Sequence, residues 1–323
     1  MAVTKISALP GLVTVASGTQ FLVVDSGSTY NTTASNVAAY IKGANLPSLT
    51  STLNTSAPND TNNVSGLTAS GGSTNQFLAL VPKGTGGITG AIPDSSSTGG
   101  NVRGTKSVDL QFTRNAATQV ALGSGSAIIG GSYNTVDSTG YLSFIGGGLY
   151  NNLTGYYSAA IGGGWGSDRG QYQTVVQGSW NGANSLGMAQ FRRTVLTRDT
   201  TTATPAVLLC DSGGVASATS QVYVAGAAAY AYKIQVIANT FAGNSYVKAW
   251  TISGAVKRTG NAASTQLVGS PTYVVDAADQ FTTAWTVAVS ADTTNGALAV
   301  TVTGEASRSI RWVATVETTE SGS

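Results

Sequence analysis

The stretch from Ile128 to Gly166 reads IIGGSYNTVDSTGYLSFIGGGLYNNLTGYYSAAIGGGWG. An isoleucine followed by two or three glycines returns every sixteen residues, at Ile129, Ile145 and Ile161. A weaker copy follows at 176–178, where glutamine stands in place of the isoleucine. A short fixed period of this kind indicates a fold of stacked repeats, in which each repeat packs on its neighbours.

Each repeat combines a short apolar run, a glycine cluster and a polar turn that carries tyrosine, asparagine or aspartate. One strand per turn, with glycine where the backbone bends or approaches a neighbour, predicts a parallel β-roll over residues 123–190. Four turns leave an apolar face and both ends of the roll exposed. We therefore expect identical chains to cover that face in a homotrimer.

The composition excludes several classes of function. Charged residues make up 9% of the 323 residues, against roughly 25% in an ordinary globular protein. Histidine is absent, which excludes Ser-His-Asp and Cys-His catalysis and every histidine metal site. The net charge is +2 without a basic cluster, so we expect no nucleic-acid partner. We predict that the protein is not an enzyme and has no metal and no cofactor.

The few charged or reactive residues have simple structural interpretations. The basic pairs at 192–193 and 257–258 are interpreted as solvated strand positions, and Cys210 as a small apolar residue. No segment has about 18 consecutive apolar residues, and the start of the chain lacks the pattern of a secretion signal. We therefore expect no membrane insertion.

Two motifs suggest chemistry and are better explained by structure. Asp276 and Asp279 form the one close aspartate pair, which resembles a glycosidase acid/base pair, but aspartate between two strand-like runs favours a turn. The run GGWGSD at 163–168 matches the first six positions of a calcium-binding nonapeptide. Gly170 stands where that motif needs a large apolar residue, and the sister repeats lack the aspartate.

Residues 191–323 change to an alternating pattern. Tyr232, Ile234 and Val236 alternate with polar residues, and Asn295-Gly296 separates two further alternating runs, which predicts a hairpin. Six to eight such strands predict a jelly-roll-like β-sandwich whose tryptophans fill the core. The fold class is therefore an elongated all-β protein.

The N-terminal part is predicted in two segments. Residues 1–43 combine a strand at 21–24 with one short helix that Ser35 begins and Gly43 ends. Residues 44–122, rich in threonine, serine, asparagine and glycine, are predicted as a low-complexity linker or shaft.

Aromatic residues of the repeat region are the receptor-binding candidates. They fall near the turns, beside asparagine and glutamine, where exposed rings stack on sugars or form an interaction surface. The other interpretation is that they cover the surface of the roll or fill the trimer interface. The candidates are Tyr133, Tyr150, Tyr157, Trp165 and Trp180.

Several stretches carry a resemblance to bacteriophage tail-fibre and related virion fibre proteins. KISALPGL at 5–12 and FLVVDSGSTYNTTASNVAAYI at 21–41 resemble the N-terminal virion-attachment segment of such proteins. The glycine-rich repeats are similar to the head repeats of trimeric autotransporter adhesins. The end of the chain, from RRTVLTRDTTTATPAVLL to VSADTTNGALAVTVTGEASRSIRWVATVETTE, resembles the C-terminal β-domain of the phage proteins.

This resemblance implies a homotrimeric fibre whose N-terminal segment binds another virion protein through Ile6, Leu9, Pro10 and Leu12. It implies a protein made in the host cytoplasm that acts from the virion at the outer surface of the host. The expected function is multivalent, non-catalytic binding of a cell-surface glycan or protein. The alternatives are a structural head fibre or capsid decoration protein, and a depolymerising tailspike.

Overall fold

The computed structural model describes residues 79–179, 185–211, 214–243 and 245–322, together with four strands nearer the N-terminus. The chain divides into two compact units, Met1–Leu80 and Val81–Ser323, and each is described by itself. No helix in the described part of the chain is long and apolar enough to cross a membrane.

The N-terminal unit contains two antiparallel hairpins. Strand β1 (Gln20–Asp25) pairs with β2 (Ser28–Thr33), and β3 (Leu49–Leu53) pairs with β4 (Asn63–Leu67). β1 contains the strand predicted at 21–24. The predicted helix that ends at Gly43 lies outside the described residues. The anchoring candidates Ile6, Leu9, Pro10 and Leu12 also lie outside them.

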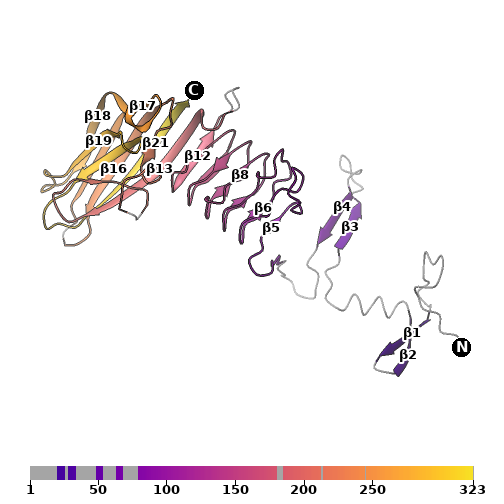
Figure 1. The fold of residues 1–323 in the computed structure, drawn as a ribbon. Coiled ribbons are helices and arrows are strands. Elements are labelled where there is room, and N and C mark those ends of the chain that lie inside the picture. Colours follow the sequence, from indigo (N-terminus) through magenta and orange to yellow (C-terminus); the bar gives the residue numbers. More distant parts are fainter. Residues whose placement is uncertain are drawn as a thin grey trace. The chain divides into compact units, whose positions relative to one another are not determined.

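The second unit begins with a parallel β-solenoid, as predicted (Figure 1). Short parallel strands stack along one face of the coil, and a second face carries β8 (Thr135–Val136) and β10 (Asn152–Leu153). The coil starts before residue 123, because its first two strands lie in the stretch predicted as linker. The strands of the first face are β5 (Ile88–Thr89), β6 (Val108–Asp109), β7 (Ala127–Ile128), β9 (Phe144–Ile145), β11 (Ala159–Gly163) and β12 (Thr174–Gly178).

The register of the coil differs from the regular sixteen-residue period. Ile128 pairs with Ile145, Ile145 with Ala160 and Ala160 with Val176, so the steps are seventeen, fifteen and sixteen residues. All four side chains are buried at 0% exposure. Because neighbouring strand residues point to opposite faces, Ile129 and Ile161 lie outward, 45% and 60% exposed. The three isoleucines that recur every sixteen residues therefore do not share one position in the coil, since Ile145 points inward.

Polar side chains organise the turns of the coil. Asn134 Oδ1 accepts a hydrogen bond from the backbone N–H of Asn151 at 2.9 Å, and Asn151 Oδ1 accepts one from Gly166 at 2.9 Å. Both asparagines are buried. This ladder satisfies backbone groups that the sharp turns leave without a strand partner.

Buried aspartates close the apolar core of the coil at both ends. Asp109, which pairs with Ile128 in the register, forms ion pairs with Arg103 at 2.8 Å and Arg114 at 3.1 Å. At the other end Asp168 is fully buried beyond Leu153. The apolar stack therefore ends in charged groups that have partners, instead of in exposed hydrophobic surface.

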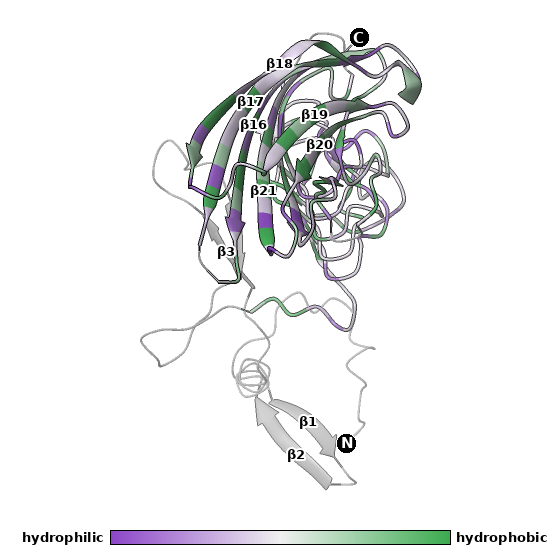
Figure 2. Ribbon diagram, turned by 90° about the vertical axis from the view of Figure 1, so that its left-hand side faces the viewer, coloured by the Kyte–Doolittle hydropathy of each residue, from purple (hydrophilic) through white to green (hydrophobic). Residues whose placement is uncertain are grey.

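The C-terminal part is the predicted two-layer β-sandwich. Its large sheet has the order β18-β17-β16-β21-β13 and continues through β12 into the coil. The second sheet faces it and contains β14, β20, β15 and β19, as Figure 2 shows for β19 and β20. The large sheet contains β13 (Ala189–Thr200), β16 (Ala228–Thr240), β17 (Val247–Arg258), β18 (Gln266–Ala278) and β21 (Ile310–Gly322). The remaining elements are β14 (Ala206–Val207), β15 (Val222–Tyr223), the 3-10 helix η2 (Ala262–Ser264), β19 (Thr286–Asp292) and β20 (Ala297–Thr303).

Three tryptophans form the centre of the sandwich core, as predicted. Trp250, Trp285 and Trp312 are 5%, 0% and 0% exposed, and the ring centroids of Trp250 and Trp312 lie 5.8 Å apart. The alternating residues of β16 all point into this core. The predicted hairpin is present as β19 and β20, with Gly296 at φ +66° in its turn.

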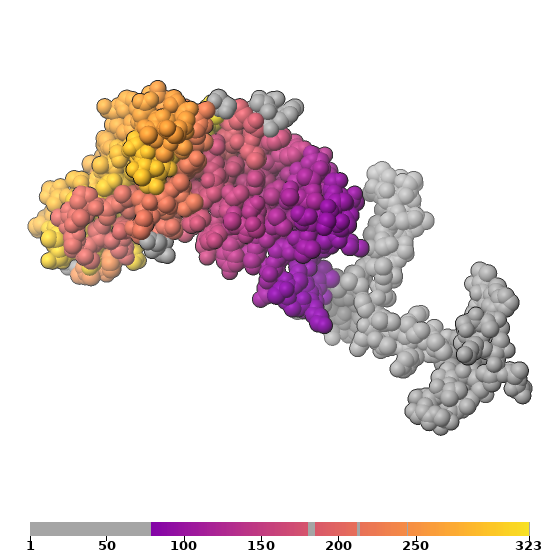
Figure 3. All heavy atoms as spheres, in the orientation of Figure 1, coloured from indigo at the N-terminus to yellow at the C-terminus, as the bar shows by residue number. Residues whose placement is uncertain are grey.

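Coil and sandwich form one body. β12 pairs antiparallel with the first half of β13, so the parallel sheet of the coil becomes the antiparallel sheet of the sandwich without a break. The surface is correspondingly continuous (Figure 3). The far half of β13, from Val195 to Thr200, extends beyond β12, and the candidate site lies there.

Candidate functional site

Three of the predicted aromatic candidates form a stack on the coil. The ring centroids of Tyr133 and Tyr150 are 4.6 Å apart, and those of Tyr150 and Trp165 are 4.2 Å apart. All three residues have φ between 55° and 61°, in the left-handed region, because each occupies the same turn of successive repeats. The structure thus brings Tyr133, Tyr150 and Trp165 together.

The stack occupies the central ring, Tyr150, on both sides. The ring of Tyr150 lies between those of Tyr133 and Trp165, so both of its faces are used within the chain. Tyr157 belongs to a separate cluster, 6.1 Å from Tyr141, and is 54% exposed. Trp180 lies outside the described residues. The rings of Tyr133, Tyr150 and Trp165 therefore interact with one another by stacking along the coil.

A second group of polar residues lies buried where coil and sandwich meet. Arg192 donates to Glu320 Oε1 at 2.6 Å and to Gln171 Oε1 at 2.7 Å, and its side chain is 1% exposed. Burial, the largest single influence, acts to lower the pKa of Arg192, but the charge and hydrogen bond of Glu320 together with the charges of Tyr230 and Asp168 outweigh it, and the pKa is raised. The interpretation of Arg192 as a solvated strand position was wrong; its neighbour Arg193 does face solvent.

Asp168, the aspartate of the GGWGSD run, belongs to the same region. It accepts backbone N–H groups from Thr154 at 3.0 Å and from Gly155 at 2.9 Å. Burial raises its pKa, and these hydrogen bonds act in the opposite direction. Asp168 therefore holds the coil backbone, in agreement with the rejection of the calcium motif.

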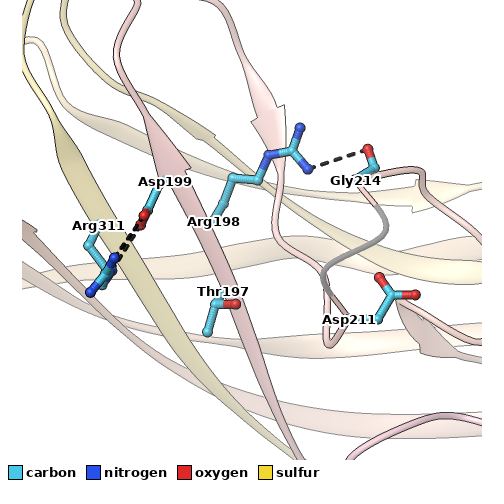
Figure 4. Close-up of a pocket in the computed structure, with 6 residues that line it drawn as sticks. All are labelled: Thr197, Arg198, Asp199, Asp211, Gly214 and Arg311. Carbon is cyan, nitrogen blue, oxygen red and sulfur yellow. Dashed lines mark hydrogen bonds and ion pairs between the residues drawn. The ribbon is translucent and has the colours of Figure 1, made fainter.

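A charged pocket of about 580 Å³ lies beside the far half of β13 (Figure 4). Asp199 faces Arg311 across β13 and β21 and accepts from its Nε at 3.0 Å and its Nη2 at 2.9 Å. Arg198 reaches toward the adjoining loop, where its Nη1 donates to the carbonyl oxygen of Gly214 at 3.3 Å. The hydrogen bonds from Arg311 lower the pKa of Asp199, so this carboxyl is ionised at neutral pH.

Asp211 is the least satisfied polar group of this pocket. Its Oδ1 is buried and has no hydrogen-bond partner within the described part of the chain. The carboxylate lies in the same pocket as the guanidinium of Arg198, whose Nε and Nη2 also make no hydrogen bond to described residues. A pocket that holds an unpartnered acceptor and free donors is one that a polar ligand can complete.

Cys210, which precedes Asp211, contributes no reactive group to this pocket. It is 3% exposed, and its Sγ lies 3.3 Å from the carbonyl oxygen of Thr219. Burial raises the pKa of the thiol to about 12. Its interpretation as a small buried residue agrees with this environment. Among the described residues, no three His, Cys, Asp or Glu side chains meet in a way that would hold a metal ion.

No protein-family model matches the chain, and no curated protein matches its sequence. Three solved structures of phage proteins are similar to it. Tailspike protein gp49 of the Acinetobacter baumannii bacteriophage Fri1, a capsular polysaccharide depolymerase, gives a TM-score of 0.27 and 12% identity over 67% of this chain and 34% of that one. The tailspike protein of Acinetobacter phage vB_ApiP_P1 gives a TM-score of 0.21 and 10% identity over 68% and 52%. The tailspike protein of A. baumannii phage AM24 gives a TM-score of 0.22 and 9% identity over 73% of this chain and 52% of that one.

The chain thus spans between a third and about half of the length of these tailspike proteins. The expectation of a protein without enzymatic activity is corrected by this finding, because the Fri1 protein is a depolymerase of capsular polysaccharide. We therefore withdraw that expectation.

The pocket residues were missed in the sequence. Asp199 and Arg311 are 112 residues apart, and only the pairing of β13 with β21 places them opposite each other. The aspartates that the sequence did single out lie elsewhere, on β18 and just after it. Asp276 accepts from Thr251 Oγ1 at 2.7 Å and lies within a strand, not in the predicted turn. Asp279 accepts from the backbone N–H of Val247 at 2.9 Å.

Proposed function

We propose that this protein is a phage virion tail protein that binds a bacterial surface polysaccharide at the charged pocket beside β13. The observation that carries the proposal is the unpartnered Oδ1 of Asp211 in the same pocket as the free donors of Arg198. The resemblance of the chain to phage fibre proteins and its likeness to tailspikes support the placement on a virion.

The chemistry of the pocket suits a sugar. Neighbouring hydroxyl groups of one sugar ring each donate and accept, so one hydroxyl donates to Asp211 while the next accepts from Arg198. The Asp199–Arg311 pair adds exposed polar groups of both signs, with side-chain exposures of 45% and 58%. Opposite charges in equal number favour a polyhydroxyl ligand over a strongly anionic one.

Replacing Asp211 by asparagine is the first test. We expect Asp211→Asn to weaken binding of the surface polysaccharide from the infected strain by about tenfold or more, the value of a hydrogen bond to a charged group. Isothermal titration calorimetry measures the affinity. The matched control is Asp137→Asn, in a turn of the coil, where the remaining oxygen still accepts from Thr139. Equal binding by wild type and Asp211→Asn would remove the pocket from the proposal.

We also propose that the protein is a homotrimer. Three weak binding sites in one assembly raise the apparent affinity through their effective concentration. An outward apolar stripe on the sheet of the coil continues onto β13. Its members are Ile129 (45% exposed), Phe144 (42%), Ile161 (60%), Val175 (36%) and Phe191 (38%). Exposed apolar residues gathered on neighbouring strands mark an interaction surface, and copies of the same chain are the occupants that we propose.

Substitution within this stripe tests the trimer. We expect sedimentation equilibrium of the wild-type protein to give three times the mass of the 32.5 kDa chain. Ile161→Asp should shift the mass toward the monomer, because the charge would be buried in the interface. The control is Ile92→Asp, at a site that is 86% exposed and outside the stripe. A monomeric wild-type protein would contradict the proposal.

A second candidate function is cleavage of the bound polysaccharide in the same pocket. The specific observation is that two carboxylates, Asp199 and Asp211, line one pocket, as glycoside hydrolysis requires. The ionised Asp199 has the protonation state of a nucleophile or base. New reducing ends after incubation with the wild-type protein, and their loss in Asp199→Asn, would identify cleavage.

A further inference from the structure

A second pocket lies at the same end of the sandwich as the charged pocket. We propose that it is a second sugar subsite, so that the ligand is a polysaccharide segment of at least two sugar units. This inference rests on the proposed function of the first pocket. The second pocket has a volume of about 310 Å³ and is lined by Thr240, Ala242, Tyr246, Ser307, Arg308 and Ser309.

The two pockets lie close together, because residues near the start of β21 line both of them. Arg311 lines the first pocket, and Ser309, two residues earlier in the chain, lines the second. Phe241 connects them, because its backbone N–H donates to the carbonyl oxygen of Ser309 at 3.2 Å while its ring lies under the guanidinium of Arg311 at 4.9 Å. Two residues along a strand span about 7 Å, which is on the scale of successive sugar rings.

The second pocket combines an aromatic wall with hydrogen-bonding groups. The guanidinium of Arg308 lies over the ring of Tyr246 at 4.9 Å, and the ring of Phe281 meets Tyr246 edge-on with centroids 5.6 Å apart. Arg308 Nε contacts Glu305 at 3.0 Å, and no hydrogen bond to a described residue uses its two Nη nitrogens. Aromatic rings beside the free Nη donors of Arg308 match the two kinds of surface that a sugar presents.

Backbone strain accompanies this pocket. Ser307 in its lining has φ +61°, and Phe281 beside Tyr246 has φ +71°. A bulky residue such as phenylalanine is rarely found in the left-handed region, and strained residues concentrate at binding sites that their surroundings hold in place. The strain presents the exposed ring of Phe281, 57% exposed, beside the pocket.

Measuring affinity for polysaccharide fragments of different length tests the second subsite separately from the proposed function. The probe is the surface polysaccharide of the infected strain, partially hydrolysed by acid and sorted by size. Affinities of fragments of one, two and four or more sugar units are measured for wild type, Arg308→Gln and Asp211→Asn. The control variant is Arg193→Gln, because Arg193 is an exposed arginine on β13 whose nearest carboxylate is 3.9 Å away.

We expect wild-type affinity to rise with fragment length, and Arg308→Gln to lower the affinity for the longer fragments by about tenfold, the value of a charge-assisted hydrogen bond. The shortest fragments should bind Arg308→Gln and wild type equally. No gain with length, or an unchanged affinity of Arg308→Gln for the long fragments, would overturn the second subsite alone. Failure of every fragment and of the intact polysaccharide to bind the wild type would overturn the proposed function itself.

Discussion

Replacing Arg192 by leucine is expected to lower the free energy of unfolding by about 3–5 kcal/mol. The substitution leaves the carboxylate of Glu320 buried without its main partner, since Arg192 Nε lies 2.6 Å from Glu320 Oε1. It also removes donors from Gln171 and from the carbonyl oxygen of Tyr223. Glu320 keeps a hydrogen bond from Gln190 at 2.7 Å and the longer ion pair with Arg169 at 3.4 Å, but a buried carboxylate that loses its shortest charged partner costs more than the lost attraction alone.

Denaturant unfolding at a fixed protein concentration measures this effect. The matched control is Arg193→Leu, one residue along β13 on the outward face, where the side chain is 54% exposed. Surface substitutions of this kind change stability by about 0.5 kcal/mol or less. Equal effects of the two leucine variants would show that the buried ion pair and its hydrogen bond to Gln171 contribute little to stability.

The second large effect is expected in the coil. Gly148 has φ +90°, and a Cβ at this position would lie 2.1 Å from the carbonyl oxygen of Gly163 on the next turn. Gly148→Ala therefore combines a left-handed alanine, which costs about 1–2 kcal/mol, with a backbone clash between successive turns. We expect a total loss of about 3 kcal/mol or more in the free energy of unfolding.

Gly130 provides the control, because a Cβ there would meet no atom within 4 Å. We expect Gly130→Ala to change the unfolding free energy by less than about 1 kcal/mol. Thermal unfolding followed by circular dichroism compares the two variants. If Gly148→Ala were as stable as Gly130→Ala, the turns of the coil would have to be spaced more loosely than the structure has them.

Periodic features were predictable from the sequence. The glycine clusters indicated the coil, because each close approach of two turns excludes a side chain. Alternation with a period of two indicated the sandwich and its core of Trp250, Trp285 and Trp312, since one face of each long strand is buried. In both cases local residue pattern and tertiary packing agree.

Features that depend on distant pairing were not predictable. A step of seventeen residues followed by one of fifteen keeps the mean period at sixteen, yet it turns Ile129 and Ile161 outward. The ion-pair partners of Arg192 and Asp199, Glu320 and Arg311, lie more than a hundred residues away in the chain. Asp199 and Arg311 of the candidate pocket form such a pair, which composition and local motifs do not indicate, whereas the aromatic receptor-binding candidates of the coil stay a prediction.

A structure of the protein bound to fragments of the host surface polysaccharide tests the central claim most directly. We predict a sugar ring in the pocket beside β13, with one hydroxyl donating to the carboxylate of Asp211 and another hydroxyl accepting from Arg198. A fragment bound along the aromatic stack of the coil, with the pocket unchanged, would contradict the account and return the binding site to Tyr133, Tyr150 and Trp165.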